Sequence, residues 1–399
     1  AGFFLPDFQN VSQNHRAVYT QMIWILAACI PFMILRMPVQ SVVLGMQLGY
    51  KLAVARTIGQ LTFVAIVWIF IQSGWQDLRL MAAAWACNYL ISLILVTFQA
   101  RKCLGVLSFS LRYVRRAEIA PMLRFGGSAF LIPISVLLFY QVDPLLIGTF
   151  MDERAVALFA PATMLVMPIR SLTAGVGTPL LSVAAQLAAD GKHQLLAELY
   201  HSAARLTGTM ATCFLLPLML FGESFLTYWM GKEFAWTWQI LAILCLGQMV
   251  TLTSFPGERM LIGSGRLGLA SSASLLAGLV KVALSVAALA LTAWPLIGLA
   301  WATTLPLLVL QGVIFPIAFC RQIGVPVGRY IAATLGRIVM SALPVAAALL
   351  AMRHFWQPHG FVETVAQVTA GFALTAAVAW FATFTQKDRT YILSMIRPK

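Results

Sequence analysis

The chain of 399 residues is 60% hydrophobic and only 10% charged, which excludes a soluble globular protein, where about 25% of residues would be charged. The net charge of +14 does not indicate nucleic-acid binding, because the basic residues are spread over short loops rather than gathered on one water-facing domain. Apolar stretches of about 20 residues recur along the chain, so the sequence predicts an all-α polytopic membrane protein. The six cysteines show no spacing typical of a metal site or a disulfide framework.

The N-terminal residues AGFFLPDFQNVSQNH contain neither an initiator methionine nor the basic and apolar regions of a signal peptide. They resemble the end of one membrane helix followed by a polar loop, and we expect the natural chain to be longer at this end. Because a helix needs about 20 residues to cross the bilayer core, eleven spans are predicted. They cover residues 21–44, 53–74, 79–100, 125–149, 155–184, 204–222, 239–263, 268–291, 296–319, 331–352 and 362–384.

Three segments between these spans differ from ordinary short loops. Residues 101–122 form the longest basic segment and are expected to connect two helical bundles. Residues 187–203 predict a short amphipathic helix on the cytoplasmic face of the membrane. The apolar side of that helix holds Leu195, Leu196 and Leu199. Residues 223–238 are rich in Trp, Phe and Tyr, which favours an aromatic belt at the membrane surface over a sugar-stacking role.

Lysine and arginine are unevenly distributed between alternate loops. One set of loops holds 17 of these residues, and the other set holds five, namely Arg16, Arg79, Arg154, Lys232 and Arg353. Cytoplasmic loops carry an excess of positive charge. The first set, which includes residues 101–124 and the C-terminus, is therefore expected to be cytoplasmic.

Residues 123–162, LRFGGSAFLIPISVLLFYQVDPLLIGTFMDERAVALFAPA, carry a family pattern. The matching positions are Arg124, Phe125, Gly126, Gln141, Asp143, Gly148, Ala155, Val156, Ala157 and Leu158. Residues 179–206 and the turn GSGR at 263–266 fit the same pattern in order and spacing. The chain therefore resembles O-antigen and exopolysaccharide flippases of the Wzx type. These belong to the MOP superfamily, together with the lipid II flippase MurJ and the multidrug MATE exporters.

The resemblance implies a two-bundle transporter of fourteen helices, of which this chain would hold helices four to fourteen and lack the first three. Residues 1–100 would be the remainder of the N-terminal bundle and 101–122 a cytoplasmic connector. Residues 123–320 would form the C-terminal bundle, and 321–399 two additional helices with a cytoplasmic tail.

The function that the resemblance implies is transport of an undecaprenyl-diphosphate-linked oligosaccharide across the bacterial inner membrane by alternating access. No enzymatic activity and no cofactor are implied, but coupling to H⁺ or Na⁺ is. The implied partners are the lipid-linked oligosaccharide, membrane lipids, and polysaccharide polymerase and chain-length proteins, and they do not include nucleic acid.

Charged residues inside the predicted spans are the candidate site residues, because such groups usually face the bundle interior or a wet cavity. Arg170 and Lys281 lie near the middle of their spans, and Arg36 lies about two-thirds of the way to the cytoplasmic side. Three deep cations with few acids nearby favour an anionic substrate such as a diphosphate, which arginine binds through two parallel donors. The alternative for each cation is a buried pair between helices.

The other intramembrane charges are more ambiguous. Glu258, Arg259 and Arg337 lie one or two turns from a cytoplasmic end, where snorkelling or a local ion pair is a simpler explanation than a place in the cavity. Asp143 lies roughly 12 Å above Arg170 along the membrane normal. Three roles are open for it: pairing with a cation on a helix absent from this chain, titration as an ion-coupling carboxylate, or acceptance of backbone hydrogen bonds near Pro144.

Two other functions fit a chain of this kind. A MATE-like multidrug or metabolite cation antiporter would share the fold, but it would be expected to keep deep acids rather than deep cations. A membrane polysaccharide polymerase or ligase would carry a long outer loop, whereas the predicted outer loops are short. The histidines do not pair with a deep carboxylate, and the GSG turn lacks the context of a phosphate loop.

The charge distribution predicts that residues 113 and 393 face the cytoplasm. With Tyr113→Cys and Leu393→Cys introduced separately, a membrane-impermeant thiol reagent should label neither position in intact cells and both in inverted vesicles. Arg353→Cys, on the opposite face, is the matched control and should label in intact cells. Labelling of position 113 or 393 from outside intact cells would contradict the orientation.

Overall fold

The computed structural model describes residues 13–45, 49–74, 78–104 and 116–384, together with Gln386 and Arg389. Every regular element within these residues is helical. Ten of the described helices are long and apolar enough to cross a membrane, and a bent pair at residues 126–140 and 143–150 makes up to eleven. The prediction of an all-α membrane protein with about eleven spans is confirmed.

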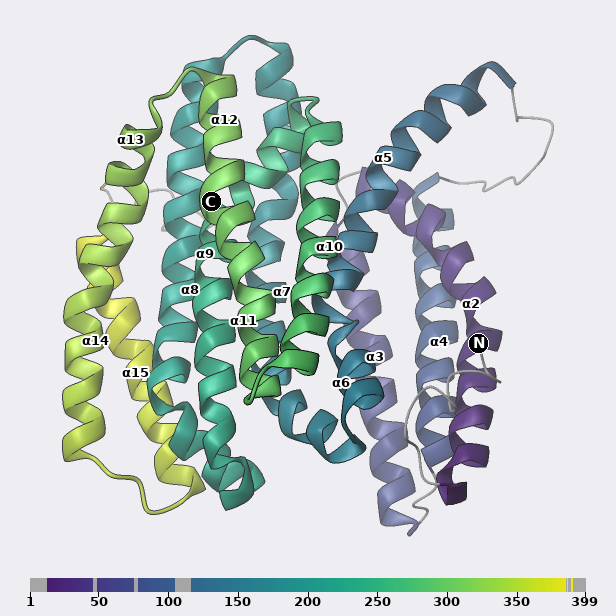
Figure 1. The fold of residues 1–399 in the computed structure, drawn as a ribbon. Helices are drawn as coiled ribbons and strands as arrows, with labels where there is room; N and C mark the ends of the chain where they lie inside the picture. The colour runs from purple at the N-terminus through teal and green to yellow at the C-terminus, as the bar shows by residue number, and fades with distance from the viewer. Residues whose placement is uncertain are drawn as a thin grey trace. The chain divides into compact units, whose positions relative to one another are not determined.

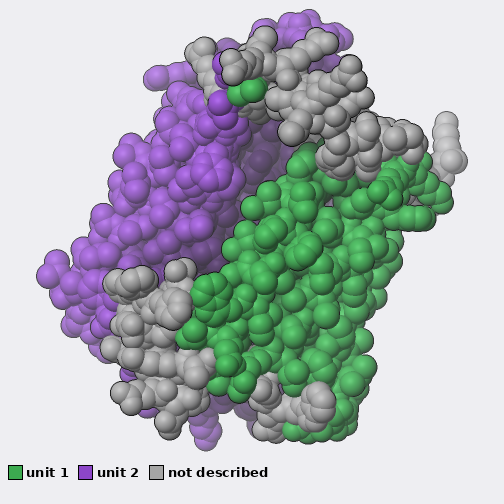
Figure 2. Space-filling view, turned by 90° about the vertical axis from the view of Figure 1, so that its right-hand side faces the viewer, with its two compact units in different colours: residues 1–119 green, residues 120–399 purple. Residues whose placement is uncertain are grey.

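The chain divides into two compact units, residues 1–119 and 120–399, which are coloured separately in Figure 2. The division falls within residues 101–122, the segment that the sequence analysis assigned to a connector. Residues 105–115 of this segment lie outside the described residues.

The described residues of unit 1 form three long helices, before α5 (Arg116–Tyr140) begins at its end. They are α2 (Gln13–Gly45), α3 (Gly49–Gln72) and α4 (Leu78–Leu104). Helix α4 packs against both α2 and α3. The core between them is small and aliphatic, and its buried members are Val39, Val43, Leu52, Ala55, Val96 and Ala100.

Unit 2 contains the remaining helices (Figure 1). In chain order they are α5 (Arg116–Tyr140), α6 (Asp143–Phe150), α7 (Glu153–Ala189), α8 (His193–Met230), η2 (Lys232–Thr237), α9 (Trp238–Gly263), α10 (Leu267–Leu291), α11 (Pro295–Val309), η3 (Leu310–Ile314), α12 (Phe315–Ile323), α13 (Val327–Tyr330), η4 (Ile331–Gly336), α14 (Arg337–Phe355) and α15 (Phe361–Ala382). Helix α9 packs against α7, α8 and α11, while α14 and α15 pack against each other and against α8.

Small residues let the helices of unit 2 approach closely, as is usual where lipid supplies no hydrophobic drive for association. A Cβ atom at Gly278 of α10 would lie 3.2 Å from Leu138 of α5. At Gly263, the last residue of α9, a Cβ atom would overlap the backbone carbonyl oxygen of Leu181 in α7. Because they lack a side chain, these glycines allow close contact of α10 with α5 and of α9 with α7.

The expectation of a separate amphipathic helix at residues 187–203 is wrong. Helix α7 continues to Ala189, the chain turns at Gly191 with φ +68°, and α8 then runs unbroken from His193 to Met230. No glycine or proline interrupts the first turns of α8, and Leu196 and Tyr200 are buried there rather than laid on a membrane surface. The Tyr200 ring stacks on Tyr330 at 4.8 Å, which fixes this end of α8 against the rest of unit 2.

Arg205, one of the 17 basic residues that the sequence analysis counted in the cytoplasmic loops, does not lie in a loop. It lies within α8, is 8% exposed, and donates from Nη2 to Ser202 Oγ at 3.2 Å.

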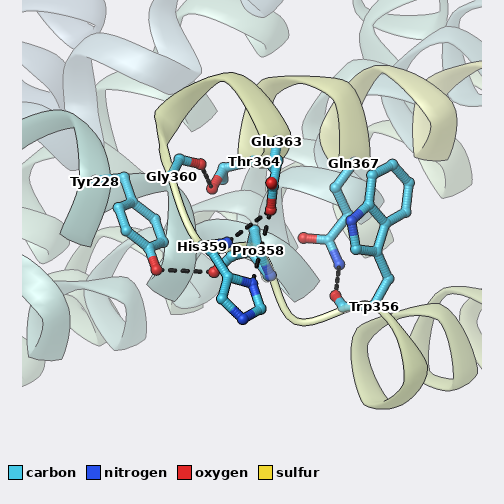
Figure 3. Close-up of polar contacts among 8 residues, drawn as sticks. All are labelled: Tyr228, Trp356, Pro358, His359, Gly360, Glu363, Thr364 and Gln367. Atoms are coloured by element: carbon cyan, nitrogen blue, oxygen red, sulfur yellow. Dashed lines mark hydrogen bonds and ion pairs between the residues drawn. The ribbon is translucent and has the colours of Figure 1, made fainter.

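The connection between α14 and α15 is held by hydrogen bonds to backbone carbonyls (Figure 3). Tyr228 of α8 donates to the Pro358 carbonyl at 2.8 Å, and Gln367 Nε2 donates to the Trp356 carbonyl at 2.8 Å. At the end of α8, in the segment expected to form an aromatic belt, Tyr228 and Trp229 are exposed. The belt itself stays a prediction.

The contact at Gly263 predicts a steric penalty for any side chain. Gly263→Ala should destabilise the protein by about 1–3 kcal/mol, because the carbonyl of Leu181 belongs to a helix and cannot rotate away. Gly268→Ala is the matched control, since a Cβ atom at that position would have no neighbour within 4 Å. The check is the thermal unfolding midpoint of both variants in detergent, and equal midpoints would contradict the packing of α9 on α7.

Candidate functional site

The break between α5 and α6 brings a carboxylate into the interior of unit 2. Helix α5 ends at Tyr140, and α6 begins at Asp143 after a bend of 43°. Pro144 causes the break, because it has no N–H and its ring would clash with the carbonyl of Tyr140 four residues earlier. Asp143 therefore occupies the first turn of α6, where the partial positive charge of a helix N-terminus favours an anion.

Asp143 forms a buried ion pair with Lys281. Lys281 Nζ of α10 donates to Asp143 Oδ1, and Thr303 Oγ1 of α11 donates to Oδ2 at 3.3 Å. Lys281 is 0% exposed and Asp143 is 4% exposed. The two charges neutralise each other, so three separate helices are tied at one point without an isolated charge in an apolar interior.

This pairing bears on two expectations from the sequence. The partner of Asp143 is Lys281 of this chain, rather than a cation on a helix absent from it. Lys281 was grouped with Arg170 as a candidate for the substrate cavity, but its charge is committed to Asp143. It is not among the residues that line either of the two cavities described below.

A larger cavity of about 170 Å³, here called the arginine pocket, lies within unit 2. Its walls come from α5, α7, α9, α10, α11 and η3, and include Tyr140, Arg170, Phe255, Glu258, Arg259, Ser274 and Gln311. The Arg170 guanidinium lies 4.0 Å from the centroid of the Tyr140 ring. Tyr140 Oη accepts a hydrogen bond from Gln248 Nε2 at 3.0 Å. The face of the Tyr140 ring therefore stabilises the Arg170 guanidinium, and the hydrogen bond from Gln248 of α9 fixes the position of Tyr140.

Arg259 and Glu258 line the same pocket, which the sequence analysis had treated as the less favoured role for both. The Arg259 guanidinium lies 4.6 Å from the Phe255 ring centroid, and its buried Nε has no hydrogen-bond partner. Glu258 is 7% exposed and accepts from Gln311 Nε2 at 2.9 Å. Within the part of the chain that the structure describes, no carboxylate forms an ion pair with Arg170 or Arg259. The pocket thus holds two unneutralised guanidinium groups and one carboxylate.

A smaller cavity of about 30 Å³ lies between the arginine pocket and the ion pair. Asp143, Thr303, Gln248, Tyr140 and Arg170 line it, so it shares Tyr140 and Arg170 with the arginine pocket. Phe139, Val166, Met167 and Leu244 supply apolar walls, but the cavity's volume and its polar groups suit one water molecule. Asp143 and Arg170, which the sequence placed on separate levels, therefore face one cavity, because the α5–α6 bend turns Asp143 inward.

Two further candidates lie elsewhere. Arg36 is half-buried in α2 of unit 1, and Arg337 is exposed at the start of α14. Neither lines the two cavities of unit 2.

Sequence reasoning missed Tyr140, Gln248 and Gln311. An uncharged polar residue in an apolar run is a weaker signal than a charge, but the isolated amide in LLVLQGVIF is of the same kind as the aspartate in LFYQVDPLLIG.

Comparisons with known proteins agree with this architecture. A family model described as "Polysaccharide biosynthesis protein" matches residues 10–238. Among solved structures, the chain is similar to the lipid II flippase MurJ in an inward closed conformation. The TM-score is 0.66 and the identity 13%, over 99% of this chain and 80% of that chain. A search of curated proteins gave no match. At this identity, the likeness to the solved structure is evidence of the fold alone.

The buried pair predicts a specific pattern in mutants. Lys281→Met should lower membrane abundance sharply, since loss of one partner from a buried pair costs about 3–5 kcal/mol. Asp143→Asn should do the same, and Asp143→Asn combined with Lys281→Met should restore abundance because no isolated charge remains. Quantitative immunoblotting of membranes and unfolding midpoints would check this. Full abundance of both single variants would contradict the pair.

Proposed function

The chain belongs to the family of polysaccharide biosynthesis proteins, and we propose that it moves an undecaprenyl-diphosphate-linked oligosaccharide across the bacterial inner membrane. The family and the flippase-like fold support a transporter of a lipid-linked substrate. In this proposal the protein acts by alternating access and catalyses no covalent step. The lipid tail stays in the bilayer while the head group passes through the protein.

The observation that carries the proposal is Arg170, which forms no ion pair with a described carboxylate and lies in the wall of a pocket within an apolar helix bundle. A guanidinium in such a place requires an anion, water or an aromatic face. Tyr140 supplies the aromatic face and leaves the five N–H donors of the guanidinium free to meet a ligand in the plane of the group. A diphosphate has the charge and the oxygen spacing that arginine binds with two parallel hydrogen bonds.

Arg259 supports the same assignment from α9. Its Nε is a buried donor without a partner, and a buried donor left unpaired costs about 1–3 kcal/mol. A phosphate oxygen in the pocket would satisfy it. Lys281 fits a phosphate ligand less well, because releasing it would leave Asp143 as a buried unpaired carboxylate.

Ion coupling is assigned in this proposal to Asp143. The small cavity brings room for water up to the carboxylate, and the same cavity is lined by Arg170. In a different state of the transport cycle from the one described, a proton or Na⁺ bound to Asp143 would transiently displace Lys281 and thereby loosen the contact between α6, α10 and α11. The charge distribution supports a cytoplasmic C-terminus, and the transported product would pass to polysaccharide polymerase and chain-length proteins.

The test concerns Arg170. Arg170→Ala should reduce transport about 10- to 100-fold while membrane abundance stays normal, because one charge-assisted contact of about 1.5–3 kcal/mol is lost. Arg170→Lys should recover only part of the activity, since a point charge replaces the planar fork. The measurement is surface polysaccharide in a strain that lacks the chromosomal gene.

Arg154→Ala is the matched control on the same helix. Arg154 is exposed at the start of α7, where it donates to Glu233, and it faces neither cavity. This control should retain full transport. Full transport by Arg170→Ala at normal abundance would overturn the proposed diphosphate site.

A further inference from the structure

The arginine pocket has a second polar side whose chemistry does not suit a phosphate. Helix α9 contributes Gln248 at the level of Tyr140 and Arg170, and Glu258 ten residues later. At 1.5 Å per residue, these two levels are about 15 Å apart along α9. Gln248 lines only the small cavity, whereas Thr251, Phe255 and Glu258 of the same helix line the arginine pocket, which therefore extends toward the Gly263 end of α9.

At this second side, the carboxylate of Glu258 is buried and forms no ion pair with a described basic residue, the neighbouring Arg259 included. Glu258 is 7% exposed and Gln311 is 5% exposed, and their one mutual hydrogen bond occupies Oε2 of the carboxylate. Among the described residues, no donor bonds to the other oxygen, Oε1, and no basic group forms an ion pair with Glu258. Neither residue thus has its hydrogen-bonding capacity filled, because Gln311 Oε1 is buried without a partner as well.

The backbone around Gln311 is unusual. Residues Leu310–Ile314 form a π-helical turn between α11 and α12, and Leu310 and Gln311 both line the pocket. Single π-helical turns within α-helices are rare and occur frequently at functional sites. The turn at the pocket wall is independent of the hydrogen-bonding argument and points to the same place.

The ligand chemistry follows from which groups are left open. The carboxylate Oε1 and the amide Oε1 are acceptors, and Ser274 adds a hydroxyl to the same wall. A phosphate would meet a like charge here, whereas a group that carries several O–H donors would be bound by adjacent acceptors. Pyranose hydroxyls are such a group.

We propose that Glu258 and Gln311 form a hydroxyl-binding subsite that holds the sugar attached to the diphosphate and selects among sugars. This inference rests on the proposed function, since it takes the Arg170 side to be the diphosphate site. A carboxylate that accepts a hydrogen bond from a sugar hydroxyl rejects an epimer whose hydroxyl points elsewhere, because the buried acceptor is then left unpaired. In this proposal Arg170 and Arg259 supply affinity for the charge, and Glu258 with Gln311 recognises the sugar.

The experiment compares four probes with the purified protein in detergent. The probes are undecaprenyl diphosphate alone and undecaprenyl diphosphate bearing a single glucose, galactose or N-acetylglucosamine, with Kd measured by native mass spectrometry. The wild type should bind at least one sugar-bearing probe about 10- to 100-fold more tightly than the bare lipid diphosphate. Glu258→Gln and Gln311→Met should remove this difference and leave the Kd for the bare lipid diphosphate unchanged.

Controls separate this inference from the proposed function. Arg170→Ala should weaken binding of all four probes by a similar factor, and failure of that result alone would count against the diphosphate site. Gln322→Met alters a half-buried amide on α12 that lies outside the pocket, bonded to the Ser264 carbonyl at 3.4 Å, and should leave every Kd unchanged. Unfolding midpoints identify any variant that fails to fold, and Glu258→Gln keeps the shape of the native side chain.

Three results would overturn the subsite. The first is a wild type that binds no sugar-bearing probe more tightly than the bare lipid diphosphate. The second is a pair of folded variants, Glu258→Gln and Gln311→Met, that both keep the wild-type preference. The third is an equal loss of affinity for all four probes in these two variants, which would make them part of the charge site or of the scaffold.

Discussion

The buried pair of Asp143 and Lys281 is the interaction on which the interior of unit 2 depends. An ionised group in an apolar helix bundle must be neutralised by a partner or must face a polar cavity. Here α6 supplies the anion, α10 the cation and α11 a hydroxyl, so one interaction sets the relative positions of three helices. The Pro144 break makes this possible, because a continuous helix through residues 140–144 would direct the carboxylate elsewhere.

The remaining deep charges of unit 2 show the second way to satisfy the same constraint. Arg170 and Arg259 have aromatic rings beneath them and a polar cavity beside them, rather than a carboxylate partner. A paired charge contributes to the architecture and is unavailable to a ligand, whereas a guanidinium supported only by a ring keeps its donors for one. This distinction separates a structural charge from a binding charge more clearly than depth in the membrane does.

Much of the fold could be predicted from the sequence, because runs of about 20 apolar residues leave few alternatives to membrane-spanning helices. The predicted GSGR turn occurs in the structure, where Gly265 has φ +87°, whereas the predicted span 125–149 is bent by 43° ahead of Pro144. The first turns of α8 could not be predicted, because a polar and apolar mixture such as HQLLAELYHSAAR suits a membrane surface as well as a buried helix end. Only the contacts of Tyr200 with Tyr330 and Phe319 decide between them.

The candidate site was predictable only in part for a similar reason. The sequence identifies Arg170, Asp143 and Lys281 as charged residues inside apolar spans. The ion pair between Asp143 and Lys281 depends on which faces of α6 and α10 are in contact, and a local sequence pattern does not determine those faces. The amides Gln248 and Gln311 acquire their roles entirely from neighbours on other helices. Sequence reasoning therefore finds the charged members of a membrane site and misses the neutral groups that orient them.

The central claim is that Arg170 binds the diphosphate while Lys281 stays paired with Asp143. A structure determined by electron cryomicroscopy in lipid nanodiscs, with a lipid-linked sugar diphosphate bound, would test this most directly. The account predicts phosphate oxygens within hydrogen-bonding distance of the Arg170 guanidinium and Lys281 Nζ still bonded to Asp143. Phosphate bound to Lys281, or a substrate that leaves the arginine pocket empty, would contradict it.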